Sequence, residues 1–230
     1  RQMCIRDSTQ TIDPATSTMK VTTGVSLGPL LISAAPFYAT VNDTETLVYI
    51  SNNLGSSISV LNISDISNIP SPDIILFSSE RSQNPQMVLP NGSCMSIDGT
   101  LLYVACAGTV SSGTTSGGIA IFNTIDNSFN QFVSSPSFIG PSQVITNPDG
   151  TLLFVSNNYG TPSSIVVLSA ITLTVVSTQT VGSGTTFLER IAISTDGNYI
   201  YGIPKSPVAP TYLPLFFMTV NSTFAVSQSA

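Results

Sequence analysis

The sequence contains no histidine and no tryptophan among its 230 residues. Histidine is the side chain whose ordinary pKa lies close to neutral pH, and its imidazole is a common ligand of transition metals. The absence of histidine excludes imidazole-based acid–base catalysis and imidazole-ligated metal sites, so any proton transfer would fall to carboxylates. Most of the carboxylates lie at expected turns, where an aspartate caps the backbone of its own turn. We therefore expect no bound cofactor, no metal site and no catalytic residue within this sequence.

Charged residues are also scarce, at 8% of the sequence, compared with about 25% in an ordinary soluble domain. Six Lys and Arg against 12 Asp and Glu leave a net charge of -6. Six scattered cations cannot form the basic patch that holds a phosphate backbone, which excludes nucleic acid as a partner. Ser, Thr, Asn and Gly supply the polarity instead, and this composition favours an extracellular or cell-surface location.

Long hydrophobic runs are missing as well. The most apolar windows are "LGPLLISAAPFYATV" (27–41) and "YLPLFFMTV" (212–220), and proline interrupts both of them. A transmembrane helix needs about 20 consecutive, predominantly apolar residues. We therefore expect no membrane span.

Cysteine is limited to Cys4, Cys94 and Cys106. A hairpin that turns at Asp98–Gly99 would place Cys94 opposite Tyr103. Side chains alternate between the two faces of a strand, so Cys106 would then point to the other face. This geometry predicts two buried free thiols and argues against a disulfide between them.

What the sequence does contain is a repeat. Four segments read alike: "ETLVYISNN" (45–53), "GTLLYVACA" (99–107), "GTLLFVSNN" (150–158) and "GNYIYGIPK" (197–205). Their aromatic residues, spaced 54, 51 and 47 residues apart, are Tyr49, Tyr103, Phe154 and Tyr201. Asp-Gly precedes three of these segments, and Asp-Gly between β-rich runs is a strong hairpin signal.

Each repeat holds four short runs of Val, Ile, Phe and Tyr, bounded by Ser, Gly, Pro and Asn, and none has a helical apolar stripe. Four antiparallel strands recurring at this period indicate a β-propeller blade. A β-sandwich is the alternative, but it would not repeat one hairpin at near-constant spacing. We predict an all-β propeller with a half blade at 11–28 and four blades at about 29–84, 85–140, 141–182 and 183–230.

The first eight residues, "RQMCIRDS", have neither strand alternation nor helical period, and they resemble a translated sequencing adapter. The ending "VSLGP" (25–29) recurs as "SFIGP" (137–141), which makes 11–28 the second half of a blade. We interpret residues 1–10 as an artefactual leader and expect the chain to be part of a larger ring of about seven blades. The alternative is a complete protomer whose open edges pair with adjacent copies in a ring or filament.

The tetrapeptides "YISN" (49–52), "YVAC" (103–106) and "FVSN" (154–157) resemble the signature of the YVTN-type propeller repeat, and the blade around Asp149 and Gly150 matches it best. The fourth blade departs from the pattern with "YGIP" (201–204). The resemblance implies a propeller fold and a place among surface-layer and other cell-surface proteins. Propellers of similar appearance also include lactone hydrolases, so the resemblance constrains function less than fold.

Two sets of residues are candidates for function. Glu189 and Arg190 form an adjacent charged pair at the entry to an inner strand, where they could contact a ligand in the channel; a solvated pair is the alternative. The sequence N-x-S/T marks four possible glycosylation sites, all expected in exposed turns or blade connections: Asn42, Asn62, Asn91 and Asn221. Chance matches are the alternative in a sequence this rich in Asn, Ser and Thr.

Two functions follow from these observations. The first is a non-catalytic extracellular propeller that acts as a structural, adhesive or interaction module, with a protein or glycan at the cell surface as its partner. The second is a fragment of a lactonase-like propeller enzyme whose active residues lie in blades outside this sequence. Low charge, hydroxyl-rich loops and the glycosylation motifs favour the first.

Overall fold

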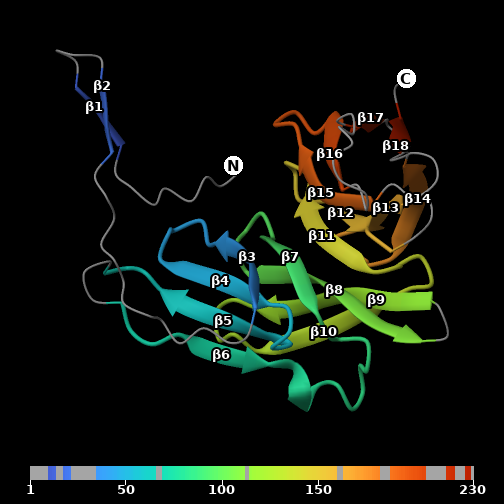
Figure 1. Cartoon of the computed structure of the whole chain (residues 1–230), viewed down its shortest axis with the longest axis horizontal. Helices are drawn as coiled ribbons and strands as arrows, with labels where there is room; N and C mark the ends of the chain where they lie inside the picture. Colours follow the sequence, from blue (N-terminus) through green and yellow to red (C-terminus); the bar gives the residue numbers. More distant parts are fainter. Residues whose placement is uncertain are drawn as a thin grey trace.

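The computed structural model describes residues 10–13, 18–21, 35–65, 69–111, 114–159, 163–181, 187–205, 216–220 and 226–228. Four four-stranded sheets make up most of this part of the chain, and strands consecutive in sequence are neighbours and antiparallel in every sheet. Figure 1 shows the sheets following one another around the molecule, with β7 and β11 side by side near its centre. The predicted all-β propeller of four-stranded antiparallel blades is confirmed.

The strands of the four blades have the following bounds. The first blade holds β3 (Pro36–Val41), β4 (Leu47–Asn52), β5 (Ser57–Asn62) and β6 (Asp73–Leu76). The second holds β7 (Pro90–Met95), β8 (Leu101–Ser111), β9 (Thr114–Asn123) and β10 (Phe129–Ser134). The third holds β11 (Pro141–Thr146), β12 (Leu152–Asn157), β13 (Ser163–Ser169) and β14 (Val175–Val181). The fourth holds β15 (Phe187–Ile193), β16 (Tyr199–Lys205), β17 (Phe216–Val220) and β18 (Val226–Gln228).

Two further elements lie outside these sheets. A short 3-10 helix, η1 (Phe77–Ser79), follows β6. Before the first blade, β1 (Gln10–Asp13) and β2 (Thr18–Val21) pair with each other in a separate two-stranded sheet. Residues 1–9 of the predicted leader lie outside the described residues, whereas Gln10 lies in β1; the artefactual origin of the leader stays a prediction.

The core consists of layers between successive blades, because each blade alternates its apolar side chains between its two faces. In β8, Leu102 and Val104 pack toward the first blade, whereas Tyr103 and Ala105 pack toward the third. The same alternation in β12 directs Phe154 toward the fourth blade. Stability therefore depends on contacts between neighbouring blades, as in other stacked repeats.

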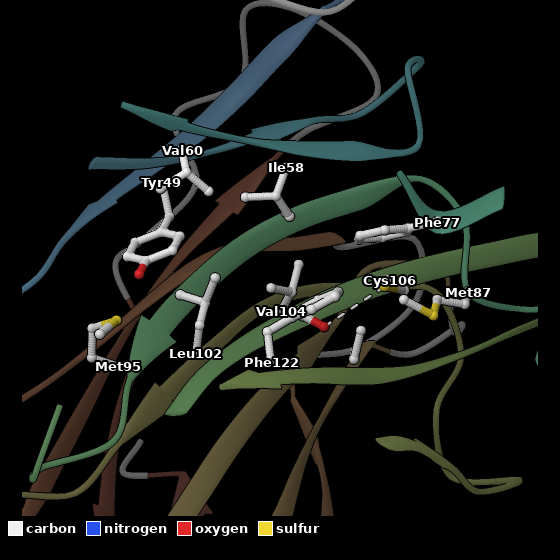
Figure 2. Close-up of a cluster of buried hydrophobic side chains, with 11 residues drawn as sticks. Tyr49, Ile58, Val60, Phe77, Met87, Met95, Leu102, Val104, Cys106 and Phe122 are labelled. Atoms are coloured by element: carbon white, nitrogen blue, oxygen red, sulfur yellow. Dashed lines mark hydrogen bonds between the residues drawn. The ribbon is translucent and has the colours of Figure 1, made fainter. Parts of the chain in front are cut away.

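The layer between the first and second blades is drawn in Figure 2. Phe122 stacks on Phe77 with ring centres 5.5 Å apart, and the edge of Phe129 meets Phe122 at 5.9 Å. Tyr49, one of the recurring aromatic residues, belongs to the same layer and is 1% exposed. Phe77 and Met87 lie near the two ends of the connection between the first and second blades, and both are fully buried in this layer.

The cysteines face opposite sides of the second blade as predicted; Cys106 is buried, but Cys94 is half-buried, in part against the prediction of two buried thiols. Cys94 pairs with Tyr103 across β7 and β8, and both Cys94 and Cys106 are free thiols. Cys106 packs in the layer between the first and second blades, while Cys94 packs against the layer between the second and third. Burial raises the pKa of the Cys106 thiol to about 12 and raises that of Cys94 as well.

We expect both thiols to be unreactive in the folded protein. In a Cys4→Ser variant, a thiol reagent at about pH 8 should label Cys94 and Cys106 only after denaturant is added, because thiolate is the reactive form and burial suppresses it. The raised pKa values also mean that the folded chain holds protons that the unfolded chain loses, so stability should fall as pH rises above about 9. Rapid labelling without denaturant would contradict the packing described.

Candidate functional site

The innermost strand of every blade carries a β-bulge close to its start. The register shifts between Pro36 and Tyr38 in β3, between Pro141 and Gln143 in β11, and at corresponding points of β7 and β15. A bulge inserts an unpaired residue and redirects the side chains beside it. The innermost strands are also the ones that approach one another across blades, so the bulges point residues of several blades toward a shared axis.

The bulges are where the repeat stops repeating. Proline precedes the bulge in three blades, at Pro36, Pro90 and Pro141. The two residues that follow differ in every blade: Phe37–Tyr38, Asn91–Gly92, Ser142–Gln143 and Glu189–Arg190. Each blade therefore directs a different pair of side chains toward the shared axis.

Three of these side chains meet, and we call Tyr38, Gln143 and Arg190 the axial cluster. The guanidinium carbon of Arg190 lies 5.0 Å from the ring centre of Tyr38 and 4.9 Å from that of Phe37. A guanidinium over an aromatic face at this distance is held by cation–π attraction. Arg190 therefore bridges the last blade to the first.

Gln143 holds the cluster from the third blade. Its Nε2 donates to the Tyr38 hydroxyl at 3.3 Å, and its Oε1 accepts from the backbone N–H of Ile191 at 2.9 Å. The second blade contributes Gly92, and a Cβ there would lie 2.8 Å from Cγ of Gln143. Gln143 can therefore pack here only because Gly92 has no side chain.

The axial cluster presents donors. Nη1 of Arg190 is buried and has no hydrogen-bond partner among the described residues. Tyr38 keeps its proton, because burial raises its pKa more than the charge of Arg190 lowers it, and the neutral phenol is a donor. A buried guanidinium nitrogen without an acceptor is costly unless an oxygen of a ligand or a water satisfies it. The cluster thus suits a carbonyl or carboxylate oxygen.

Glu189 and Arg190, the charged pair predicted from the sequence, have different places in the structure. Arg190 joins the axial cluster, while Glu189 is the extra residue of the β15 bulge and is half-buried. Sequence reasoning missed Tyr38, Gln143 and Gly92 because they come from three blades and have no shared motif. The signal that could have found them is the variable pair directly after each recurring proline.

The aspartates of the hairpin turns have structural roles, as predicted. Oδ1 of Asp149 accepts from the backbone N–H and the hydroxyl of Thr151, at 2.9 and 2.6 Å. These hydrogen bonds hold the pKa of Asp149 below its usual range, and similar bonds do so at Asp98 and Asp196. In an antiparallel meander these turns lie at the end of the blades opposite the bulges, so their carboxylates are remote from the axial cluster.

The four glycosylation motifs lie in different settings. Asn62 is exposed, whereas Asn42 is half-buried and caps its own turn through Oδ1, which accepts from the backbone N–H of Leu47 at 2.8 Å. Asn91 corrects the expectation of an exposed loop: it lies in β7 and is 8% exposed, and its Nδ2 donates to the Pro141 carbonyl at 2.9 Å. A glycan on that nitrogen is incompatible with this packing between blades. Asn221 lies outside the described residues.

The described residues include no group of three or more His, Cys, Asp and Glu side chains that could hold a metal ion. The same residues include no helix with the length and apolar character that crossing a membrane requires.

Solved structures with lactonase names are among those similar to this chain. Hydrazine synthase from Kuenenia stuttgartiensis superposes with a TM-score of 0.67 at 18% identity, over 95% of this chain and 58% of that one. The periplasmic gluconolactonase of Pseudomonas aeruginosa superposes with a TM-score of 0.65 at 14% identity, over 84% of this chain and 55% of that one. A protein of Bacteroides uniformis assigned as a 6-phosphogluconolactonase superposes with a TM-score of 0.64 at 16% identity, over 96% of this chain and 63% of that one.

At these identities the similarity shows the propeller fold and nothing more specific. This chain spans less than two thirds of the length of each of the three structures. No family model and no curated protein sequence matches it. The resemblance to YVTN-type repeats therefore stays a prediction.

Proposed function

We propose that this chain is the ligand-binding part of a lactonase-like propeller, and that its axial cluster binds a sugar acid or the corresponding lactone. The observation that carries the proposal is the buried Nη1 of Arg190, held over two aromatic rings and without an acceptor among the described residues. The structural similarity to propellers named as gluconolactonases supports the same choice of ligand.

The distribution of charge supports an anionic or oxygen-rich ligand at this end of the propeller. Arg81 and Arg190 are the cations whose side chains the structure describes, and both lie toward the bulged ends of the innermost strands, each directly after a glutamate, Glu80 and Glu189. The turn end carries aspartates, including Asp98, Asp149 and Asp196, and neither of these two cations. A carboxylate would be repelled there and attracted at the axial cluster.

In lactone hydrolysis, water attacks the carbonyl carbon, negative charge develops on the carbonyl oxygen, and the ring C–O bond breaks to give the hydroxy acid. Arg190 and the Tyr38 hydroxyl would stabilise that developing charge, as fixed donors do in an oxyanion site. The turn aspartates are held by their own turns, so we assign the group that deprotonates water to parts of the protein outside this chain. The chain alone should then bind ligand without turning it over.

Binding of D-gluconate tests the proposal. Calorimetric titration of the full chain should show saturable binding, and Arg190→Gln should weaken it at least about tenfold, because a charge-assisted hydrogen bond is lost. Arg81→Gln is the matched control, since it removes a guanidinium outside the axial cluster, and it should leave the affinity within about twofold. Equal affinities of wild type and Arg190→Gln would refute the assignment.

A cell-surface module of the YVTN kind is the second candidate, and one observation favours it. Asn62 is exposed, and its Oδ1 accepts from the hydroxyl of Ser64, the third residue of its own motif, at 2.6 Å. An extracellular location with a glycan at this position is the corresponding proposal. Its partner would be a protein or glycan at the cell surface, recognised without catalysis.

A further inference from the structure

A second candidate site lies in a cavity of about 360 Å³ between the first three blades. Arg81, Val88, Leu89, Thr109 and Tyr159 are among the residues that line it. Its residues come from blade connections and from the links between second and third strands, which lie toward the bulged ends of the innermost strands. None of them belongs to the axial cluster.

Two walls of the cavity depart from the blade repeat. One is the connection from η1 to β7, which holds Arg81, Val88 and Leu89 and is longer than the connection between β10 and β11. The other is an extension of the β8–β9 hairpin, where Thr109 pairs with Ser116 beyond a register shift. Strands β4 and β5 of the first blade have no such extension, since a turn at 53–56 joins them directly.

The two walls are fastened together. Oε1 of Gln86, in the connection, accepts hydrogen bonds from the backbone N–H and from the hydroxyl of Thr109, each at 3.0 Å. Backbone N–H groups of Ala107 and Gly108 donate to the carbonyls of Leu89 and Val88, at 3.1 and 3.3 Å. The cavity is thus a built feature of the fold.

Backbone strain is located in its lining. Leu89 has φ of +53° and Ser56 has φ of +42°, in the left-handed region that costs a residue with a side chain about 1–2 kcal/mol. The equivalent positions are Ala35 before the first blade, with φ of +58°, and Gly140 before the third, with φ of +64°. The left-handed conformation therefore recurs directly before the proline of these three innermost strands, and glycine adopts it freely.

The lining combines apolar surface with a single positive charge. Val88 is 4% exposed, and Tyr159 is 54% exposed, with its ring against the backbone of Gly140. Arg81 is exposed at the same cavity, and among the described lining residues it is the one with a charged side chain. A flat apolar body against Tyr159 and Leu89, with an anionic group toward Arg81, satisfies both features.

We propose that this cavity binds a small aromatic monocarboxylate. Charge complementarity with Arg81 selects an anion, and the apolar lining selects an aromatic body over a polyhydroxylated one. The site does not depend on the proposed function, because it shares no residue with the axial cluster.

Titration with 2-naphthoate tests the site, with neutral 2-naphthamide as the matched ligand. On the full chain, naphthoate should bind saturably and about tenfold more tightly than the amide. Arg81→Gln should remove that difference, and Tyr159→Ala should weaken both ligands. Arg190→Gln is the control variant and should leave naphthoate affinity within about twofold.

Leu89→Gly is a second variant that should fold, because glycine is native at the equivalent position 140. It should keep or raise the melting temperature and weaken naphthoate binding about threefold. Three results would each overturn the proposal: no saturation up to ~5 mM naphthoate, equal affinity for acid and amide, or loss of binding in Arg190→Gln with retention in Arg81→Gln.

Discussion

Replacing Phe122 with alanine is expected to lower the free energy of unfolding by about 3–5 kcal/mol. Phe122 is 1% exposed, stacks on Phe77 and meets the edge of Phe129, so its removal leaves a cavity between the first and second blades. Neighbouring blades stabilise each other only across such layers, and the surrounding strands cannot close the gap without breaking their hydrogen bonds.

Urea denaturation followed by far-ultraviolet circular dichroism measures this effect. Ile125→Ala is the matched control in the turn that follows the same strand, because Ile125 is 87% exposed, and it should change the free energy by less than about 0.5 kcal/mol. A loss below about 1 kcal/mol for Phe122→Ala would show that the layer is not packed as described.

Gly108→Ala should be similarly damaging for a different reason. Gly108 has φ of +79°, and a Cβ on it would lie 1.6 Å from the carbonyl oxygen of Ser116, which is backbone and cannot rotate away. The two strands of the β8–β9 extension must then move apart at this point. We expect a loss of at least about 3 kcal/mol, made up of left-handed strain and lost strand pairing.

The control for this prediction is Gly99→Ala. Gly99 has nearly the same φ, +71°, but the nearest atom to its added Cβ would be Oδ2 of Asp43 at 3.8 Å, an ordinary contact. Only the conformational strain of about 1–2 kcal/mol should remain. Hydrogen exchange at Thr109 should also accelerate in Gly108→Ala and not in Gly99→Ala; equal effects of the two substitutions would contradict the close approach at Gly108.

The parts of the fold that were predictable from sequence are those fixed by local chemistry. The Asp-Gly turns set the hairpins, and the aspartates accept hydrogen bonds from the following backbone as expected. The turn runs from Ser96 to Leu101 and is longer than two residues, but it is centred between Asp98 and Gly99 as expected, which is why the pairing of Cys94 with Tyr103 followed from residue numbers alone. The recurring aromatic residue lies in the second strand of each blade, as expected.

The candidate site was not predictable in the same way. Tyr38, Gln143 and Arg190 are brought together only by the curvature of the propeller and by bulges that redirect each innermost strand. The prediction of an exposed glycosylation site at Asn91 was wrong for a related reason. The sequence "NGS" is typical of a turn, but here it lies at the bulge of β7, and Nδ2 of Asn91 contacts the next blade. Local sequence patterns contain no information about which blade a bulge will face.

The most direct test of the axial site is the side-chain nitrogen NMR spectrum of the arginines during titration with D-gluconate. The chain labelled at arginine would be compared with its Arg190→Lys variant to assign the Arg190 guanidinium. We expect the Arg190 signals to shift and saturate with gluconate, while those of Arg81 stay in place. Shifts at Arg81 without a change at Arg190, or no shift at either residue, would contradict the assignment of the axial cluster as the ligand site.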